Sequence, residues 1–95
     1  MRIVWDEAKD RRNRAKHKVS FELAQAVFDD PFALSIPDRM TGTEERWQTL
    51  GLVGQGVVLL VAHTYIDADG EETVRIISAR KATARERKIY AQGAG

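Results

Sequence analysis

Two apolar runs joined by an Asp-Gly turn constrain the fold of this chain most. Residues 57–66 and 73–79 are rich in β-branched side chains, and the segment between them, DADGEE, contains the Asp-Gly pair of a tight hairpin turn. Strands joined by so short a connection pair in antiparallel fashion. The second half of the chain is therefore predicted to form an antiparallel sheet.

Two helices are predicted in the first third of the chain. Asp6 is expected to cap a helix that runs to about Lys18, because the acidic residues of this segment come first and most of its cations come later. Ser20 is expected to cap a second helix, which ends at the DDP segment because a proline disfavours helical geometry in the residue before it.

The end of the chain predicts one more helix, because Thr83 and Glu86 have the spacing of a capping box. Shorter strands are expected over residues 2–5, 32–36 and 46–53, with a polar loop, PDRMTGTEE, over residues 37–45. The predicted order is β-α-α-β-β-β-β-α. It indicates an α+β fold in which helices cover one face of an antiparallel sheet.

Length and composition limit the class of protein. A chain of 95 residues has room for one core, so residues 1–95 are expected to form a single domain. The chain has no cysteine, no apolar run long enough to span a membrane, and acidic residues where a signal peptide needs its apolar segment. We expect a cytoplasmic protein with no membrane association.

Charge is distributed unevenly along the chain. Residues 1–18 carry seven basic and three acidic side chains, residues 19–74 carry two and ten, and residues 75–95 carry six and one. The last block gathers five cations where an apolar strand ends: Arg80, Lys81, Arg85, Arg87 and Lys88. Such a cluster can bind a phosphate, since guanidinium groups match phosphate oxygens in pairs, but a solvated helix with surface ion pairs is an equally good interpretation.

Motifs for other chemistry are absent from the sequence. His17 and His63 are the two histidines, and neither has a second ligand at metal-binding spacing. The segment DADGEE lacks the frame of a calcium loop, and neither a phosphate-binding loop nor a GxSxG nucleophile motif is present. We predict neither a metal site nor a cofactor.

Several other side chains allow two interpretations. His63 lies in an apolar run, where a hydrogen-bonded core histidine is more frequent than a general acid or base. Glu45 and Arg46 are more often a surface ion pair than part of a site. Tyr90 is either a packing residue or an aromatic platform for a base. The cations of the first helix spread around it, which predicts a solvated or partner-covered helix rather than a pocket.

Taken together, these segments resemble a known family. The stretches VWDEAKDRRNRAKHKVSFELAQAVFDDP, EERWQTLG, VVLLVAHT and VRIISARKATARERKIY are similar to the BrnT toxins of type II toxin-antitoxin systems. Family members commonly have a glycine after the histidine of the first helix, where this chain has Lys18. Lys18 is therefore expected to adopt a strained left-handed conformation.

The resemblance implies a RelE-like fold, with two N-terminal helices packed on an antiparallel sheet and a short C-terminal helix. It implies a ribonuclease that cleaves RNA to inhibit translation and growth and that a BrnA-type antitoxin neutralises. The antitoxin would carry the DNA-binding part, so the toxin would meet DNA indirectly, as part of a complex that represses its own operon. Since no metal site is predicted, we expect a metal-independent endoribonuclease.

Roles for individual residues follow as a hypothesis. Cleavage without a metal requires a base, an acid and cations around the phosphorus that the RNA 2′-OH attacks. We assign phosphate stabilisation to Arg80, proton transfer to His63 or Glu45, and RNA binding to Arg46, Lys81, Arg85 and Tyr90. Two alternatives remain: a non-catalytic co-repressor that partners a DNA-binding antitoxin and, less favoured, a DNA-binding domain. Convergence of Arg80, His63 and Glu45 in one cleft would favour the enzyme.

Overall fold

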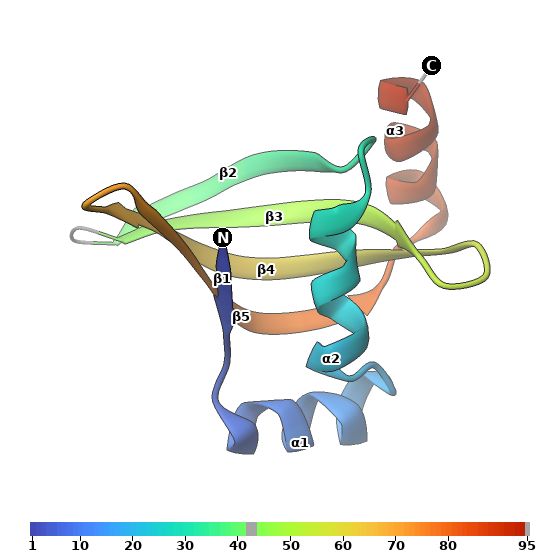
Figure 1. The fold of residues 1–95 in the computed structure, drawn as a ribbon. Coiled ribbons are helices and arrows are strands. Elements are labelled where there is room, and N and C mark those ends of the chain that lie inside the picture. Colours follow the sequence, from blue (N-terminus) through green and yellow to red (C-terminus); the bar gives the residue numbers. More distant parts are fainter. Residues whose placement is uncertain (42–43, 95) are drawn as a thin grey trace.

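The computed structural model describes residues 1–41 and 44–94 and contains three α-helices, a 3₁₀ helix and five strands within them (Figure 1). In chain order these are β1 (Arg2–Val4), α1 (Glu7–His17), α2 (Phe21–Ala24), the 3₁₀ helix η1 (Gln25–Asp29), β2 (Leu34–Thr41), β3 (Glu44–Val53), β4 (Val57–Ala68), β5 (Glu71–Lys81) and α3 (Ala84–Ala94). The α+β class is confirmed.

The five strands form one sheet in the order β1-β5-β4-β3-β2. Neighbouring strands from β2 to β5 are antiparallel, as the hairpin pattern predicts, but β1 pairs with β5 in parallel. The prediction of a purely antiparallel sheet is therefore wrong, and the sheet is mixed. The last strand of the chain lies between the first strand and β4.

The prediction of a polar loop over residues 37–45 is also wrong for most of its length. Strand β2 continues to Thr41 and β3 begins at Glu44, while residues 42 and 43 lie outside the described part. Pro37 lies in β2, an edge strand, where a proline is tolerated better than in a central strand, and the register shifts directly after it.

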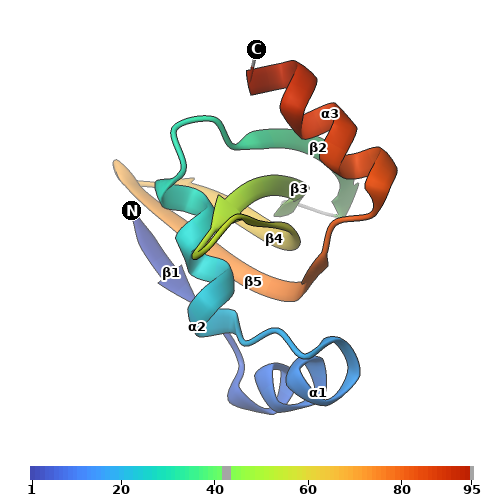
Figure 2. The same ribbon diagram turned by 90° about the vertical axis from the view of Figure 1, so that its right-hand side faces the viewer.

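Helices cover both faces of the sheet, not one as predicted. Figure 2 shows α2 and α3 on opposite sides of the strands. A buried cluster under α2 and η1 contains Val19, Phe21, Ala24, Val27, Val53, Leu59, Val61, Ile76 and Ala79. A smaller cluster under α3 contains Leu50, Leu60, Ala82 and Tyr90. We call these two sides the α2 face and the α3 face.

A glycine lets η1 approach the sheet closely. A Cβ atom at Gly51 would lie 2.6 Å from the Cβ of Val27, which is nearer than two side chains can approach. Because glycine has no Cβ, the backbone of β3 comes directly against η1. The predicted second helix ends as the DDP segment indicates, but its second half, from Gln25, is wound as the tighter 3₁₀ form.

The predicted helix caps are confirmed. Asp6 accepts hydrogen bonds from the backbone N–H groups of the first turn of α1, Ser20 accepts one from Leu23, and Thr83 and Glu86 bond reciprocally. Lys18 has φ 62° and caps the end of α1 in the left-handed conformation, as expected from its replacement of glycine. No helix among the described residues is long and apolar enough to cross a membrane.

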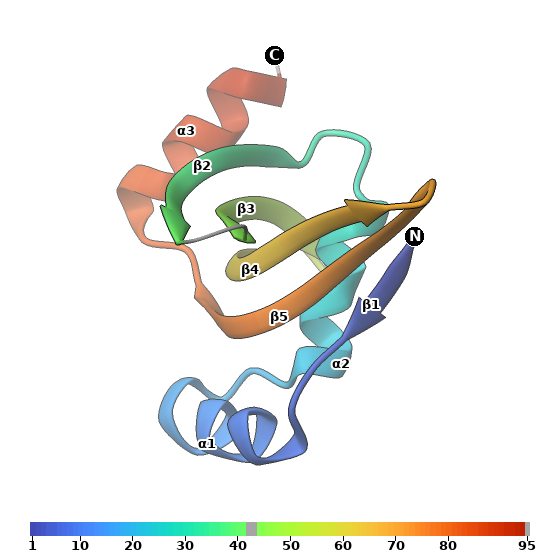
Figure 3. The same ribbon diagram turned by 90° about the vertical axis from the view of Figure 1, so that its left-hand side faces the viewer.

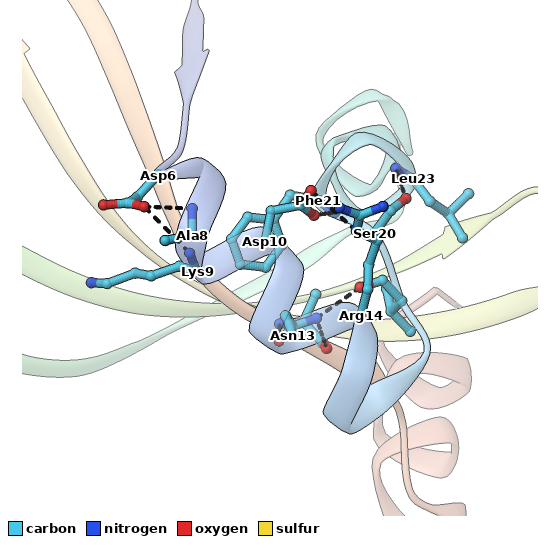
Figure 4. Close-up of polar contacts among 11 residues, drawn as sticks. Asp6, Ala8, Lys9, Asp10, Asn13, Arg14, Ser20, Phe21 and Leu23 are labelled. Atoms are coloured by element: carbon cyan, nitrogen blue, oxygen red, sulfur yellow. Dashed lines mark hydrogen bonds and ion pairs between the residues drawn. The ribbon is translucent and has the colours of Figure 1, made fainter.

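Polar contacts fix α1 at the β5 edge of the sheet (Figures 1 and 3). The buried Asn13 donates from Nδ2 to the carbonyl oxygens of Val19 and Ala79, each at 2.8 Å, and its Oδ1 accepts from the N–H of Ala79 at 3.1 Å. Asp10, also buried, accepts from the N–H of Phe21 at 2.9 Å (Figure 4). The amide of Asn13 therefore satisfies backbone groups of β5 that β1 does not reach.

Candidate functional site

The register of β3, β4 and β5 decides which side chains share a face. Arg80 lies directly opposite Leu60, and Leu60 packs with Tyr90 in the cluster under α3. Arg46 lies opposite Thr64, four residues along β4 from Leu60, and strand residues an even number apart share a face. Arg46 and Arg80 therefore both project from the α3 face.

A β-bulge adds a third arginine to this face. His63 pairs with Ile76 and Ala62 pairs with Ser78, so Ile77 is an extra residue in β5. Simple alternation predicts that Arg75 and Arg80 lie on opposite faces, but the bulge shifts the alternation by one. Arg75 is exposed and lies opposite Thr64, in the same cross-strand row as Arg46 with β4 between them. Sequence reasoning missed Arg75 because a bulge has no local signature in this strand.

The α3 face thus contains three cross-strand rows. From the turn end of the β4-β5 hairpin inward, they are Arg46-Thr64-Arg75, Gln48-Ala62-Ser78 and Leu50-Leu60-Arg80. Two rows that carry arginine flank a row of small or uncharged residues. Such a surface can bind more than one phosphate of a nucleic acid strand, since guanidinium groups recognise phosphate oxygens.

An ion pair with α3 holds Arg80 in position. Its Nη1 and Nη2 donate to the two carboxylate oxygens of Glu86, at 2.8 and 2.9 Å, and Nη1 also donates to the carbonyl of Lys81. The hydrogen bonds from Arg80 lower the pKa of Glu86 to about 2, against the opposing effect of burial. These bonds use three of the five N–H groups of Arg80, whose side chain is 38% exposed.

His63 and Glu45 lie on the opposite face. The rings of His63 and Phe28 meet edge to face, with their centroids 4.9 Å apart. Because Phe28 belongs to η1, His63 lies against this helix. Together with Ser35, Trp47 and Tyr65, His63 and Glu45 line a cavity of about 240 Å³. The structure therefore brings His63 and Glu45 together but separates both from Arg80 by the thickness of the sheet.

The hydrogen bonds of His63 define its protonation. Nδ1 lies 3.2 Å from the carbonyl oxygen of Thr64, which can only accept, so Nδ1 carries the proton. Nε2, 2.7 Å from the Thr49 hydroxyl, then accepts from it, and the Thr49 oxygen lies 2.8 Å from the hydroxyl of Ser35. Burial lowers the pKa of His63, although the Thr64 carbonyl opposes this effect. His63 is a neutral, hydrogen-bonded histidine in the wall of the cavity.

The remaining predicted residues lie apart from one another. Lys81, at the end of β5, is exposed and lies opposite Leu59, which belongs to the α2 face. Arg85 is exposed in the first turn of α3. Tyr90 is 9% exposed, and its hydroxyl donates to the carboxylate of Asp30, which raises the pKa of Tyr90 to about 12. The ring of Tyr90 is thus packed in the core and offers no open face to a base.

A second cavity lies where the sequence predicts none. Lys9, Arg12, Lys16 and His17 of α1 line a groove of about 350 Å³ together with Asn13, Ile77 and Ser78. The sequence predicts cations spread around α1, but the spacing of three and four residues places Lys9, Arg12 and Lys16 on one side of the helix, next to His17. The expectation that they form no pocket is wrong, because α1 lies along β5 and the two elements enclose the space.

Among the described residues, no group of three or more histidine or carboxylate side chains is placed to hold a metal ion. Residues 5–86 match the sequence model of a family described as the ribonuclease toxin, BrnT, of type II toxin-antitoxin systems. This chain belongs to the BrnT family. A BrnT protein is a ribonuclease toxin, and a type II system pairs the toxin with an antitoxin protein. No curated protein matches the chain.

Proposed function

We propose that this BrnT-family chain is an endoribonuclease that binds the RNA backbone on the α3 face, where Arg46, Arg75 and Arg80 project together. The observation that carries this proposal is the shared face of the three arginines, in a chain whose family consists of ribonuclease toxins. RNA binding depends mainly on neutralising phosphates with cations, and the α3 face offers Arg46 and Arg75 together with the N–H groups of Arg80 that Glu86 leaves free. Arg85, exposed in the first turn of α3, is proposed as a further RNA contact.

The proposed reaction needs no metal ion. The RNA 2′-OH attacks the adjacent phosphorus, a new 2′-O to phosphorus bond forms, and the bond to the 5′-oxygen breaks. The 2′ proton leaves with a base, and the departing 5′-oxygen takes up a proton. Negative charge grows on the phosphoryl oxygens in the transition state, so fixed guanidinium groups there accelerate the reaction. Arg80 takes this role because Glu86 already fixes its orientation.

The proposed proton-transfer residues stand apart from this arrangement. A phosphate held by Arg80 lies on the α3 face, whereas His63 and Glu45 line a cavity on the α2 face. Glu45 also accepts a hydrogen bond from the indole of Trp47 at 3.0 Å. The two sets of residues therefore define two alternative sites, and we favour the α3 face because its cations match the charge of the substrate.

We further propose a RelE-like fold, a BrnA-type antitoxin as the neutralising partner, and repression of the shared operon through the DNA-binding part of that antitoxin. The mixed sheet with N-terminal helices and a C-terminal helix supports the first, and the family supports the rest. Cleavage of RNA would inhibit translation and growth in the absence of the antitoxin, and such a toxin acts in the cytoplasm.

The test is cleavage of labelled single-stranded RNA by the purified protein in excess EDTA, scored for 2′,3′-cyclic phosphate ends. We expect Arg80→Ala to abolish cleavage and Arg46→Ala and Arg75→Ala to weaken it by about tenfold or more. Arg11→Ala, an exposed arginine on α1 outside the groove, is the control. Circular dichroism shows whether each variant is folded.

The other site is tested in parallel with Glu45→Gln and His63→Gln. If these variants lose cleavage while Arg80→Ala retains it, the site lies on the α2 face and the proposal is wrong. A wild-type protein that binds its antitoxin but cleaves no RNA, with or without ribosomes, would instead support the co-repressor.

A further inference from the structure

The groove between α1 and β5 is a basic surface that the proposed reaction does not use. Its cations, Lys9, Arg12 and Lys16, occupy one side of α1, and His17 lies beside them. Lys9 and Lys16 are seven positions apart, which spans roughly 10 Å along the helix and exceeds the rise between neighbouring phosphates of a strand. The line of cations therefore matches an extended polyanion better than a single anion.

Two structural devices make the groove a fixed feature. The three hydrogen bonds of Asn13 attach α1 to Ala79 of β5 and to the segment after the helix. The bulge at Ile77 turns this residue out of the regular alternation and into the groove, where it is half-buried. The floor of the groove therefore has an apolar side chain next to the hydroxyl of Ser78, with cations along the wall.

The groove adjoins the proposed RNA-binding face. Ser78 lines the groove and also stands in the middle row of the α3 face, between the rows of Arg75 and Arg80. A strand bound across the three arginines can therefore pass over the β5 edge at Ser78 and continue along α1. Figure 3 shows α1 directly beyond this edge of the sheet.

The charges of the groove are available to a ligand. Among the side chains that the structure describes, the ion pairs are Arg14 with Asp10 and Arg80 with Glu86, and neither involves a groove cation. The pKa of Asp6 is lowered mainly by hydrogen bonds from the N–H groups of Ala8 and Lys9 at the start of α1. The charges of Lys9 and Arg12 contribute less to this lowering. The residues that line the groove include four basic side chains and no carboxylate.

We propose that the α1-β5 groove binds the sugar-phosphate backbone of the same RNA strand, on nucleotides beyond those held on the α3 face. Lys9, Arg12 and Lys16 contact phosphates, and Ile77 offers an apolar contact to a sugar or base. This inference rests on the proposed function. An RNA strand fits better than an acidic protein segment because the groove continues the arginine face through Ser78.

The experiment compares the double variant Arg12→Gln/Lys16→Gln with the wild type. The probes are 2′-O-methyl oligouridylates of about 4 and about 12 nucleotides, which span the usual range of single-strand site sizes. The blocked 2′-oxygen prevents cleavage, so the affinity alone is measured, at several salt concentrations. Arg11→Gln is the matched control, because Arg11 is one residue from Arg12 but outside the groove.

We expect the double variant to bind the long probe about tenfold less tightly, with its salt slope reduced by about 1.4, which is about 0.7 for each lost phosphate contact on a single strand. The loss is expected to be smaller for the short probe, and Arg11→Gln should bind like the wild type. Equal losses in the double variant and in Arg11→Gln would show a general charge effect and overturn the inference.

A second measurement separates this inference from the proposed function. If the double variant loses affinity for the cognate antitoxin but keeps its affinity for RNA, the groove is a protein-binding surface and the inference is wrong. Cleavage that persists in Arg80→Ala overturns the proposed site on the α3 face. Cleavage that depends on Arg80, together with unchanged binding of the long probe by the double variant, overturns the groove alone.

Discussion

The guanidinium of Arg80 and the carboxylate of Glu86 form a two-pronged ion pair, with distances of 2.8 and 2.9 Å. Arg80 belongs to β5 and Glu86 to the first turn of α3, so the pair joins the sheet to the helix that follows it. Glu86 also accepts from the backbone N–H of Thr83, as the capping box requires. One carboxylate therefore both starts α3 and orients the proposed phosphate-binding arginine.

Glu86→Gln is expected to destabilise the protein by about 1 to 2 kcal/mol at neutral pH, because it removes a charged hydrogen-bond pair that is partly buried. The pKa of Glu86 falls from 4.5 to about 2 on folding, so its stabilisation is complete above the unfolded value and disappears as the pH falls toward 2. Urea unfolding of both proteins should show a difference that shrinks over this range. The exposed Glu71→Gln serves as control, and a constant difference would contradict the assignment.

Tyr90→Phe is expected to cost about 1 to 2 kcal/mol, because it removes the hydrogen bond to the carboxylate of Asp30. The same bond raises the pKa of Tyr90 from 10.0 to about 12, so this stabilisation is present below pH 10 and is lost as the pH rises toward 12. Ultraviolet titration of the phenol groups should lose its highest transition in the variant. If the tyrosine that the variant lacks instead titrates near the ordinary value of 10.0, the hydrogen bond does not form in solution.

Asp30→Ala is expected to lower the free energy of unfolding by about 1 to 2 kcal/mol more than Tyr90→Phe does. Asp30 accepts from the N–H of Leu52 at 2.8 Å and of Phe32 at 2.9 Å as well as from Tyr90, and the alanine leaves all three donors without this acceptor. These bonds outweigh the effect of burial and lower the pKa of Asp30. A double-mutant cycle with Tyr90→Phe measures the coupling, and strictly additive losses would argue against a shared contact.

Asn13→Ala is expected to destabilise the protein by about 2 to 4 kcal/mol, since buried backbone groups of Val19 and Ala79 lose their partners. Hydrogen exchange at the amide of Ala79 should become faster relative to the other amides of β5. Arg11→Ala on the outside of α1 is the control. Unchanged protection at Ala79 would mean that α1 does not hold this edge of the sheet.

His63→Gln is expected to reduce the decrease in the free energy of unfolding that mild acid causes. Burial lowers the pKa of His63 below 6.5, so the unfolded chain takes up a proton first, and stability declines as the pH falls through this value. Wild-type protein should therefore lose more stability between about pH 7.5 and about pH 5 than the variant does. A decline of equal size in both proteins would refute the prediction.

Local signals predict much of this fold. The caps at Asp6, Ser20 and Thr83 depend on contacts within three residues, and the left-handed Lys18 depends on a single backbone position. Such features can be predicted from the sequence because the interacting groups are close together in it. The parallel pairing of β1 with β5 joins residues about seventy positions apart, and no residue pattern near either strand predicts it.

The arrangement of the candidate site shows the same limit. Alternation along β5 places Arg75 and Arg80 on opposite faces, and the single extra residue Ile77 reverses that result. The burial of Asn13 is likewise not predictable from the sequence, because an asparagine on a polar helix is usually exposed to solvent. Its side chain is buried here because it bonds to the backbone of Ala79, at a part of β5 that β1 does not pair with. The polar residues of β2 look like a loop because an edge strand can be hydrophilic on both sides.

The position of β5 also governs when this protein can assemble. Strand β1 leaves the ribosome first, yet its partner is β5, which is the last strand to be synthesised. Until then β4 lacks one neighbour and β1 has none, and the arginines of β5 are not yet beside Arg46. A nascent chain therefore lacks its proposed RNA-binding face throughout most of translation, and the proposed activity arises only when synthesis is nearly complete.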